Sequence, residues 1–112
     1  MKLRIYQIAP ELDAKHLMFR DLQTIFTQSN GKIPEEIYEM VYEGEVEAQT
    51  LEDVYRIFNC AQPNDYHARS LSVSDVVEVI NTPDTRAFYF CDSLGFKLVA
   101  FDKTAIHRNQ ED

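Results

Sequence analysis

Tryptophan is absent from the sequence, and cysteine, glycine and proline are scarce, with two, three and four residues. The cysteines, Cys60 and Cys91, form no CxxC motif and no ligand cluster with the histidines, so we expect no metal site and no cofactor. In a reducing compartment, we expect both cysteines to be reduced and to be buried as small apolar side chains.

Long apolar runs are also missing, since none approaches the ~20 residues that a membrane-spanning helix needs. The N-terminal segment MKLRIYQIAPELD does not fit a signal peptide, because its apolar stretch is short and is interrupted by Arg4 and Gln7. We therefore expect a cytoplasmic protein without a membrane partner.

Basic residues are outnumbered, with 11 Lys and Arg against 19 Asp and Glu, which gives a formal net charge of −8 at pH 7. This charge opposes contact with a phosphate backbone, so we expect no direct binding to nucleic acid. Two interpretations stay open. Either the protein binds a protein partner that has a basic surface, or it imitates a polyanion such as DNA on a nucleic-acid-binding protein.

The length of 112 residues fits a single domain over residues 1–112. Seven Phe and six Tyr supply the bulk for one core. We expect an ordered core over about residues 2–104 and a frayed tail over residues 105–112. A monomer and a homodimer are both compatible with the sequence.

Hydrophobic periodicity in the first half predicts a strand over residues 3–6, a helix over 15–31 and a second strand from Tyr38 onward. The helix has apolar residues at i, i+4 and i+7 and ends at an Asn-Gly pair, which tolerates the left-handed conformation. Its apolar residues are Met18, Leu22 and Ile25.

The strand that starts at Tyr38 alternates apolar and acidic residues, and Gly44 indicates a bulge or bend within it. Its apolar side carries Tyr38, Met40, Tyr42 and Val46, and its acidic side carries Glu39, Glu43, Glu45 and Glu47. Residues 35–53 contain no Lys or Arg. The acidic side is either a sheet edge protected by charge or a docking surface for a basic protein.

The second half predicts a helix over residues 50–59 with Thr50 as its N-cap, followed by strands over 72–80, 86–92 and 96–102. The element order is then roughly β-α-β-α-β-β-β. This order indicates the α+β class, with a mostly antiparallel sheet of about five strands and two helices on one face.

The segment SLSVSDVVEVI, residues 70–80, places serines and an aspartate just after His67, which are the residue types of a hydrolytic site. A nucleophilic serine usually sits on a glycine-flanked turn between a strand and a helix, and no such motif occurs here. Serine and aspartate also bind main-chain groups at turns, which predicts a structural polar turn. Its residues are Ser72, Ser74, Asp75, Asp92, Ser93 and Gly95. The alternative is a small enzyme that uses Asp75, Asp92 and His67 in one cleft.

Three ordered blocks, LEDVYRIFN, PNDYHARSLSVSDVV and FYFCDSLGF, resemble the YodL-like domain family. The family consists of small bacterial domains found within or beside large proteins of conjugative and other mobile elements. Ala68 departs from the family pattern, which often has glycine there, and a positive φ at this position would strain alanine. The resemblance implies an accessory module and no defined chemistry. We accordingly expect a non-enzymatic module that binds another protein.

Overall fold

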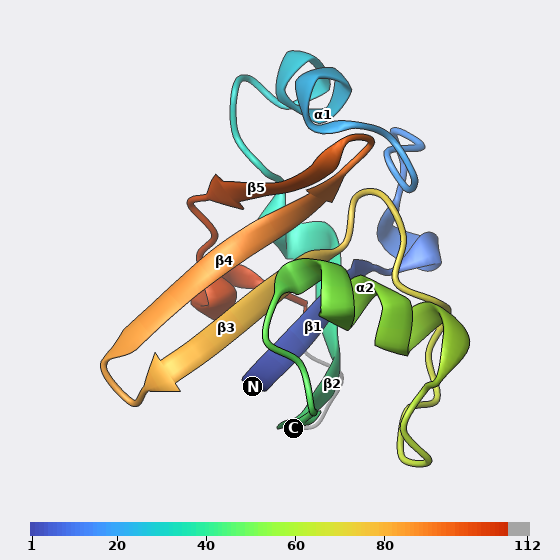
Figure 1. Cartoon of the computed structure of the whole chain (residues 1–112). Coiled ribbons are helices and arrows are strands. Elements are labelled where there is room, and N and C mark those ends of the chain that lie inside the picture. The colour runs from blue at the N-terminus through green and yellow to red at the C-terminus, as the bar shows by residue number, and fades with distance from the viewer. Residues whose placement is uncertain (108–112) are drawn as a thin grey trace.

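A computed structural model describes residues 1–107, in which five strands form one antiparallel sheet (Figure 1). The strands lie in the order β2-β1-β3-β4-β5, so β3 is central and β2 and β5 are the edges. Their bounds are β1 Lys2–Ile8, β2 Tyr38–Glu45, β3 Val76–Thr82, β4 Thr85–Asp92 and β5 Gly95–Val99. Within the described residues, no helix is long and apolar enough to cross a bilayer.

Two helices, α1 (Leu22–Gln28) and α2 (Leu51–Cys60), cover opposite faces of the sheet. The face called here the α2 face packs Leu3, Ile5 and Val77 against α2. The opposite α1 face packs Tyr6, Val76 and Phe90 against α1. The α+β class and the five antiparallel strands are confirmed, whereas the expectation that both helices share one face is wrong. The strands β1 and β3 carry apolar side chains on both faces of the sheet, so each face needs a helix that covers it.

The helix α2 begins where the sequence predicts, because its capping signals are local. Thr50 Oγ1 accepts a hydrogen bond from Asp53 N over 3.0 Å, and Asp53 Oδ2 accepts one from Thr50 N over 3.3 Å. This reciprocal capping box satisfies main-chain donors that the first helical turn leaves free. Three short 3-10 turns complete the described elements: η1 Pro10–Leu12, η2 Glu35–Ile37 and η3 Lys103–Ala105.

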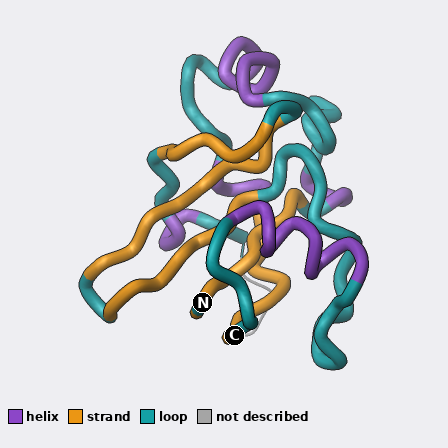
Figure 2. Tube along the Cα trace, in the orientation of Figure 1, coloured by secondary structure: helices purple, strands orange, loops and turns teal. Residues whose placement is uncertain are grey.

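The helix α1 is shorter than the one predicted over residues 15–31, and loops flank it on both sides (Figure 2). Asp13 accepts hydrogen bonds from the main-chain N–H groups of Leu17 and Met18 over 2.7 and 2.9 Å. This side chain replaces the helical hydrogen bonds of the segment with a local loop. The predicted stop is confirmed, because Asn30 and Gly31 have φ values of 58° and 80°.

A β-bulge in β2 changes the predicted alternation of that strand. The pairing with β1 skips Val41, which is an extra residue, whereas the sequence indicated an irregularity at Gly44. Residues of the same parity before and after a bulge lie on opposite faces. Tyr38 accordingly packs in the α1-face cluster and Tyr42 in the α2-face cluster, although we predicted both on one side.

The C-terminal segment returns along the α1 face. Phe101 is buried there, Ile106 packs against the same cluster, and His107 N donates to the main-chain oxygen of Tyr38 over 2.9 Å. Residues 105–107 of the predicted frayed tail are therefore tied to the body of the domain. Residues 108–112 lie outside the described residues.

Candidate functional site

The serine-rich segment forms a turn that leads into β3 and binds main-chain groups. Ser72 Oγ donates to the main-chain oxygen of Ser70 over 2.8 Å. Ser74 has a φ of 86°, and its Oγ accepts a hydrogen bond from Phe19 N over 3.0 Å. The Ser74 main-chain oxygen accepts another from Tyr38 Oη over 2.6 Å. These contacts join the turn to the loop before α1 and to the start of β2.

Asp75 is the centre of a buried polar network and has no exposed surface. Its Oδ2 accepts hydrogen bonds from Ser72 N over 2.8 Å and from Gln7 Nε2 over 3.0 Å. Arg69 Nη2 lies 3.8 Å from Asp75 Oδ1, which is too long for a hydrogen bond. Burial raises the pKa of Asp75 to about 7, although the contacts with Ser72, Gln7 and Arg69 oppose that shift.

Asp92 lies at the end of β4 and binds a different part of the main chain. Its Oδ1 accepts hydrogen bonds from Leu22 N over 3.1 Å and from Ser93 N over 2.9 Å. The first contact joins β4 to the start of α1. Gly95, with a φ of 86°, follows the two-residue turn between β4 and β5. Asp75 and Asp92 thus share no hydrogen-bond partner in the described structure.

His67 lies apart from both aspartates in burial and in contacts. Its side chain is exposed, whereas Asp75 is inaccessible and Asp92 is half-buried. No hydrogen bond within residues 1–107 joins His67 to an aspartate or a serine. The enzyme hypothesis needs these side chains together in one cleft, and the described structure does not place them so.

The two cysteines also lie in different environments. Cys91 is buried in β4, and Cys60 at the end of α2 is exposed, so the expectation that both are buried is wrong for Cys60. Burial raises the pKa of the Cys91 thiol to about 12. Across residues 1–107, no three His, Cys, Asp and Glu side chains are grouped so that they would hold a metal ion.

The acidic residues of β2 divide between the two faces at the bulge. Glu39 lies on the α2 face, and Glu43 and Glu45 lie on the α1 face. Arg4 Nη2 on β1 lies 2.9 Å from Glu43 Oε2. Within residues 1–107, no ion pair forms at Glu39, Glu45 or Glu47. These three glutamates are called the acidic edge below, because they lie on or just beyond an edge strand.

A buried carboxylate on β3, Glu78, escaped the reasoning from sequence. Tyr6 Oη donates to Glu78 Oε1 over 2.7 Å, and Arg86 Nη1 lies 2.8 Å from Oε2. Lys103 Nζ and Arg4 Nη1 lie 3.4 and 3.6 Å from the same carboxylate. Burial opposes ionisation, but these hydrogen bonds and charges outweigh it and lower the pKa of Glu78. The available signal was one charged residue inside the apolar run VVEVI.

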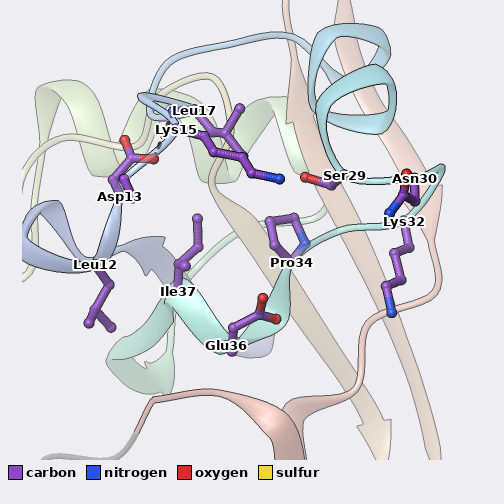
Figure 3. A pocket seen from close by; sticks show the side chains of 11 residues that line it. Leu12, Asp13, Lys15, Leu17, Ser29, Asn30, Lys32, Pro34, Glu36 and Ile37 are labelled. Carbon is purple, nitrogen blue, oxygen red and sulfur yellow. Dashed lines mark hydrogen bonds between the residues drawn. The ribbon is translucent and has the colours of Figure 1, made fainter.

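The hollow shown in Figure 3 has a volume of about 270 Å³ and lies between the loop after η1 and the segment before β2. Lys15 Nζ donates to the main-chain oxygen of Gln28 over 2.9 Å, and Asp13 binds main chain within its own loop. Lys32 and Glu36 are exposed among its lining residues. Asp13 and Lys15 are therefore occupied by main-chain contacts, and the polar side chains of the hollow do not converge on one point.

A model of the YodL-like domain family matches residues 2–101. Comparison with curated proteins and with solved structures found no match. Because the family model covers most of the chain, the chain belongs to the YodL-like domain family. Ala68, where this sequence departs from the family pattern, does not have a positive φ, so the alanine there causes no strain of that kind.

Proposed function

We propose that this YodL-like domain is a non-enzymatic protein-interaction module that docks a basic segment of its partner on the outer edge of β2 beyond Tyr38, whose main-chain oxygen already accepts a hydrogen bond from His107 N. The acidic edge carries this proposal, because Glu39, Glu45 and Glu47 have no basic partner within residues 1–107. An extended segment can add to a free strand edge through main-chain hydrogen bonds, with specificity from alternate side chains. Lys or Arg in that segment would offset the glutamate charges.

Aromatic packing on both faces of β2 favours the docking of a partner segment on its edge. Tyr42 packs against Phe58 and Tyr66, with ring centroids 5.3 and 5.6 Å apart, and Tyr38 packs edge-on against Phe101 at 5.3 Å. These aromatic contacts fix β2 on both faces of the sheet. A strand that is already ordered loses less conformational entropy when it binds a partner.

Photo-crosslinking in cells that naturally produce the protein tests this proposal. A benzophenone amino acid at Glu45 should capture a specific partner, whereas the same probe at Glu11, an exposed glutamate in η1, should not. Mass spectrometry then identifies the captured protein and the crosslinked segment. A segment rich in Lys and Arg supports the proposal. Equal capture from both positions, or a captured segment without basic residues, contradicts it.

A polyanion mimic is the second candidate, favoured by eight acidic and no basic residues between positions 35 and 53. Two contacts weaken it, since Glu43 pairs with Arg4 and Asp53 lies 3.3 Å from Arg56. The bulge also divides the glutamates between two faces, so they do not form one continuous row. Competition with DNA for the crosslinked partner separates the two functions: a mimic displaces DNA at equal site concentrations, and an ordinary interaction module leaves it bound.

The resemblance to modules of bacterial mobile elements supplies the setting that we propose for this interaction. Proteins encoded by neighbouring genes in such an element are the first candidates to test in binding assays with purified components.

A further inference from the structure

The second edge of the sheet, β5, differs in chemistry from β2. Among residues 1–107 it pairs only with β4, and Leu98 within it and Leu94 in the turn before it are 69% and 86% exposed. Natural edge strands are usually protected by charges, proline or a covering element. Lys97 is the only charged residue of β5, and it lies opposite Phe90 on the α1 face. On the α2 face, β5 therefore carries no charged side chain.

The apolar surface of the α2 face continues beyond the helix that covers it. Phe96 and Leu98 on β5 lie opposite Cys91 and Tyr89 on β4. In Figure 1, α2 lies in front of β1 and β3, and the β4–β5 hairpin extends past it. On this face of the hairpin, Phe96 is partly buried against the α2-face cluster, whereas Leu98 is largely exposed.

A hollow of about 330 Å³ lies between this hairpin and α2. Its apolar lining includes Phe96 and the half-exposed ring of Tyr55. Two carboxylates, Glu52 and Asp92, also line it. Asp92 uses Oδ1 for its main-chain contacts, and Oδ2 accepts no hydrogen bond from the described residues. The hollow therefore has both apolar and negatively charged lining residues.

We propose that β5 and this hollow form a second docking surface, which binds an extended partner segment with alternating apolar side chains and a Lys or Arg residue. Main-chain hydrogen bonds would extend the sheet by one strand, and apolar side chains at every second position would pack against Leu98 and Phe96. The basic side chain would reach Glu52 and Asp92. A match to the five residues of β5 spans roughly 17 Å.

Charge selects this occupant over a second copy of the chain. A copy would bring its own Glu52 and Asp92 and a second net charge of −8 to the interface, whereas a basic segment offsets the local carboxylates. This surface lies at the opposite edge from the acidic edge, so the inference stands independently of the function proposed for β2.

A peptide library tests the second surface directly. Random ten-residue peptides displayed on phage are selected against the whole chain, and the best peptide is synthesised and titrated by calorimetry. We expect apolar residues at alternate positions, at least one Lys or Arg, and amide chemical-shift changes in β5. Leu98→Ser should weaken binding at least fivefold. Met40→Ser, which alters an exposed apolar residue on the other edge strand, should leave it unchanged.

Two further experiments distinguish strand addition at β5 from binding elsewhere on the protein. N-methylation along one edge of the peptide should abolish binding, because it removes the hydrogen bonds to β5, whereas N-methylation along the other edge should be tolerated. Neutralising the acidic edge with Glu39→Gln, Glu45→Gln and Glu47→Gln should leave peptide binding intact. The inference is overturned if no peptide is selected, if shift changes fall outside β5, or if Leu98→Ser binds normally. A wild-type dimer that Leu98→Ser converts to a monomer also overturns it, because a second copy then occupies β5.

Discussion

At the residue scale, two buried carboxylates with opposite pKa shifts organise the polar part of the core. Asp75 on the turn before β3 is held mainly by uncharged donors, and burial dominates its titration. Glu78, three residues later, faces three cations and stays ionised. The difference follows from the partners that each side chain meets, since both carboxylates have no exposed surface.

The raised pKa of Asp75 predicts a pH dependence of stability. Its folded-state pKa is about 7 against an ordinary value of 3.8, so the folded chain holds this proton more tightly than the unfolded chain. The resulting stabilisation is complete below about pH 4 and is lost as the pH rises through about 7. Between these limits the wild type should lose up to about 4 kcal/mol of unfolding free energy relative to Asp75→Asn. Urea unfolding of both proteins across this range measures the difference, and parallel profiles would refute it.

The lowered pKa of Glu78 predicts the opposite trend. Its stabilisation is present above its ordinary pKa of 4.5 and is lost as the pH falls through the lowered value. At pH 7, Glu78→Gln should cost about 3 kcal/mol, because it leaves Arg86, Lys103 and Arg4 without the negative charge that they share. Glu45→Gln, an exposed glutamate without an ion pair in the described structure, should change stability by less than about 0.5 kcal/mol. Equal costs for the two variants would contradict this account.

At the element scale, the capping signal of α2 was predictable, whereas the local contacts before α1 and the contacts between distant segments were not. The start of α2 depends on Thr50 and Asp53, which are three residues apart, and the sequence located it correctly. The start of α1 depends on Asp21, whose Oδ1 accepts a hydrogen bond from Thr24 N over 2.9 Å, and on the contacts of Asp13 in the preceding loop, neither of which periodicity reports. The bulge at Val41 depends on the pairing with β1, which is far away in sequence. The partners of Glu78 come from β1, β4 and η3, so no local pattern could assemble them.

The close approach inside β2 gives a prediction for this element. A Cβ on Gly44 would overlap Tyr42 Oη and lie 2.7 Å from Tyr42 Cζ, and the Tyr42 ring is fixed between Phe58 and Tyr66. Gly44→Ala should therefore cost about 1–3 kcal/mol and change the near-ultraviolet circular dichroism of the tyrosines. Gly31→Ala is the control, because its Cβ would meet open space and only its φ of 80° is unfavourable. It should cost about 1 kcal/mol and leave the aromatic signal unchanged.

At the scale of the whole molecule, the open sheet presents two edges of different chemistry. Within residues 1–107, the β2 edge carries glutamates that form no ion pair, and the β5 edge carries an exposed leucine near a hollow with both apolar and acidic lining residues. The sequence predicted the acidic strand, but not that a bulge would divide its glutamates between two faces. It also gave no indication that β5 would be the other edge, because strand order depends on pairings between distant segments.

The proposed docking on the acidic edge predicts that partner binding depends on salt. Exposed charges separated by solvent are screened over about 8 Å at physiological ionic strength and over about 3 Å at 1 M. Affinity of the crosslinked partner should therefore fall at least tenfold between 50 and 500 mM NaCl. Binding of the peptide selected on β5 should weaken less, because more of its contact is apolar. Identical salt slopes for both ligands would argue against two chemically distinct edges.

If the acidic edge binds the physiological partner, removal of its charge must weaken that binding, which a calorimetric comparison measures. The crosslinked partner is titrated into the wild type and into the combined variant Glu39→Gln, Glu45→Gln and Glu47→Gln at 100 mM NaCl. We expect at least a tenfold loss of affinity in the variant, with an unchanged unfolding midpoint. Equal affinity for the two proteins would contradict it.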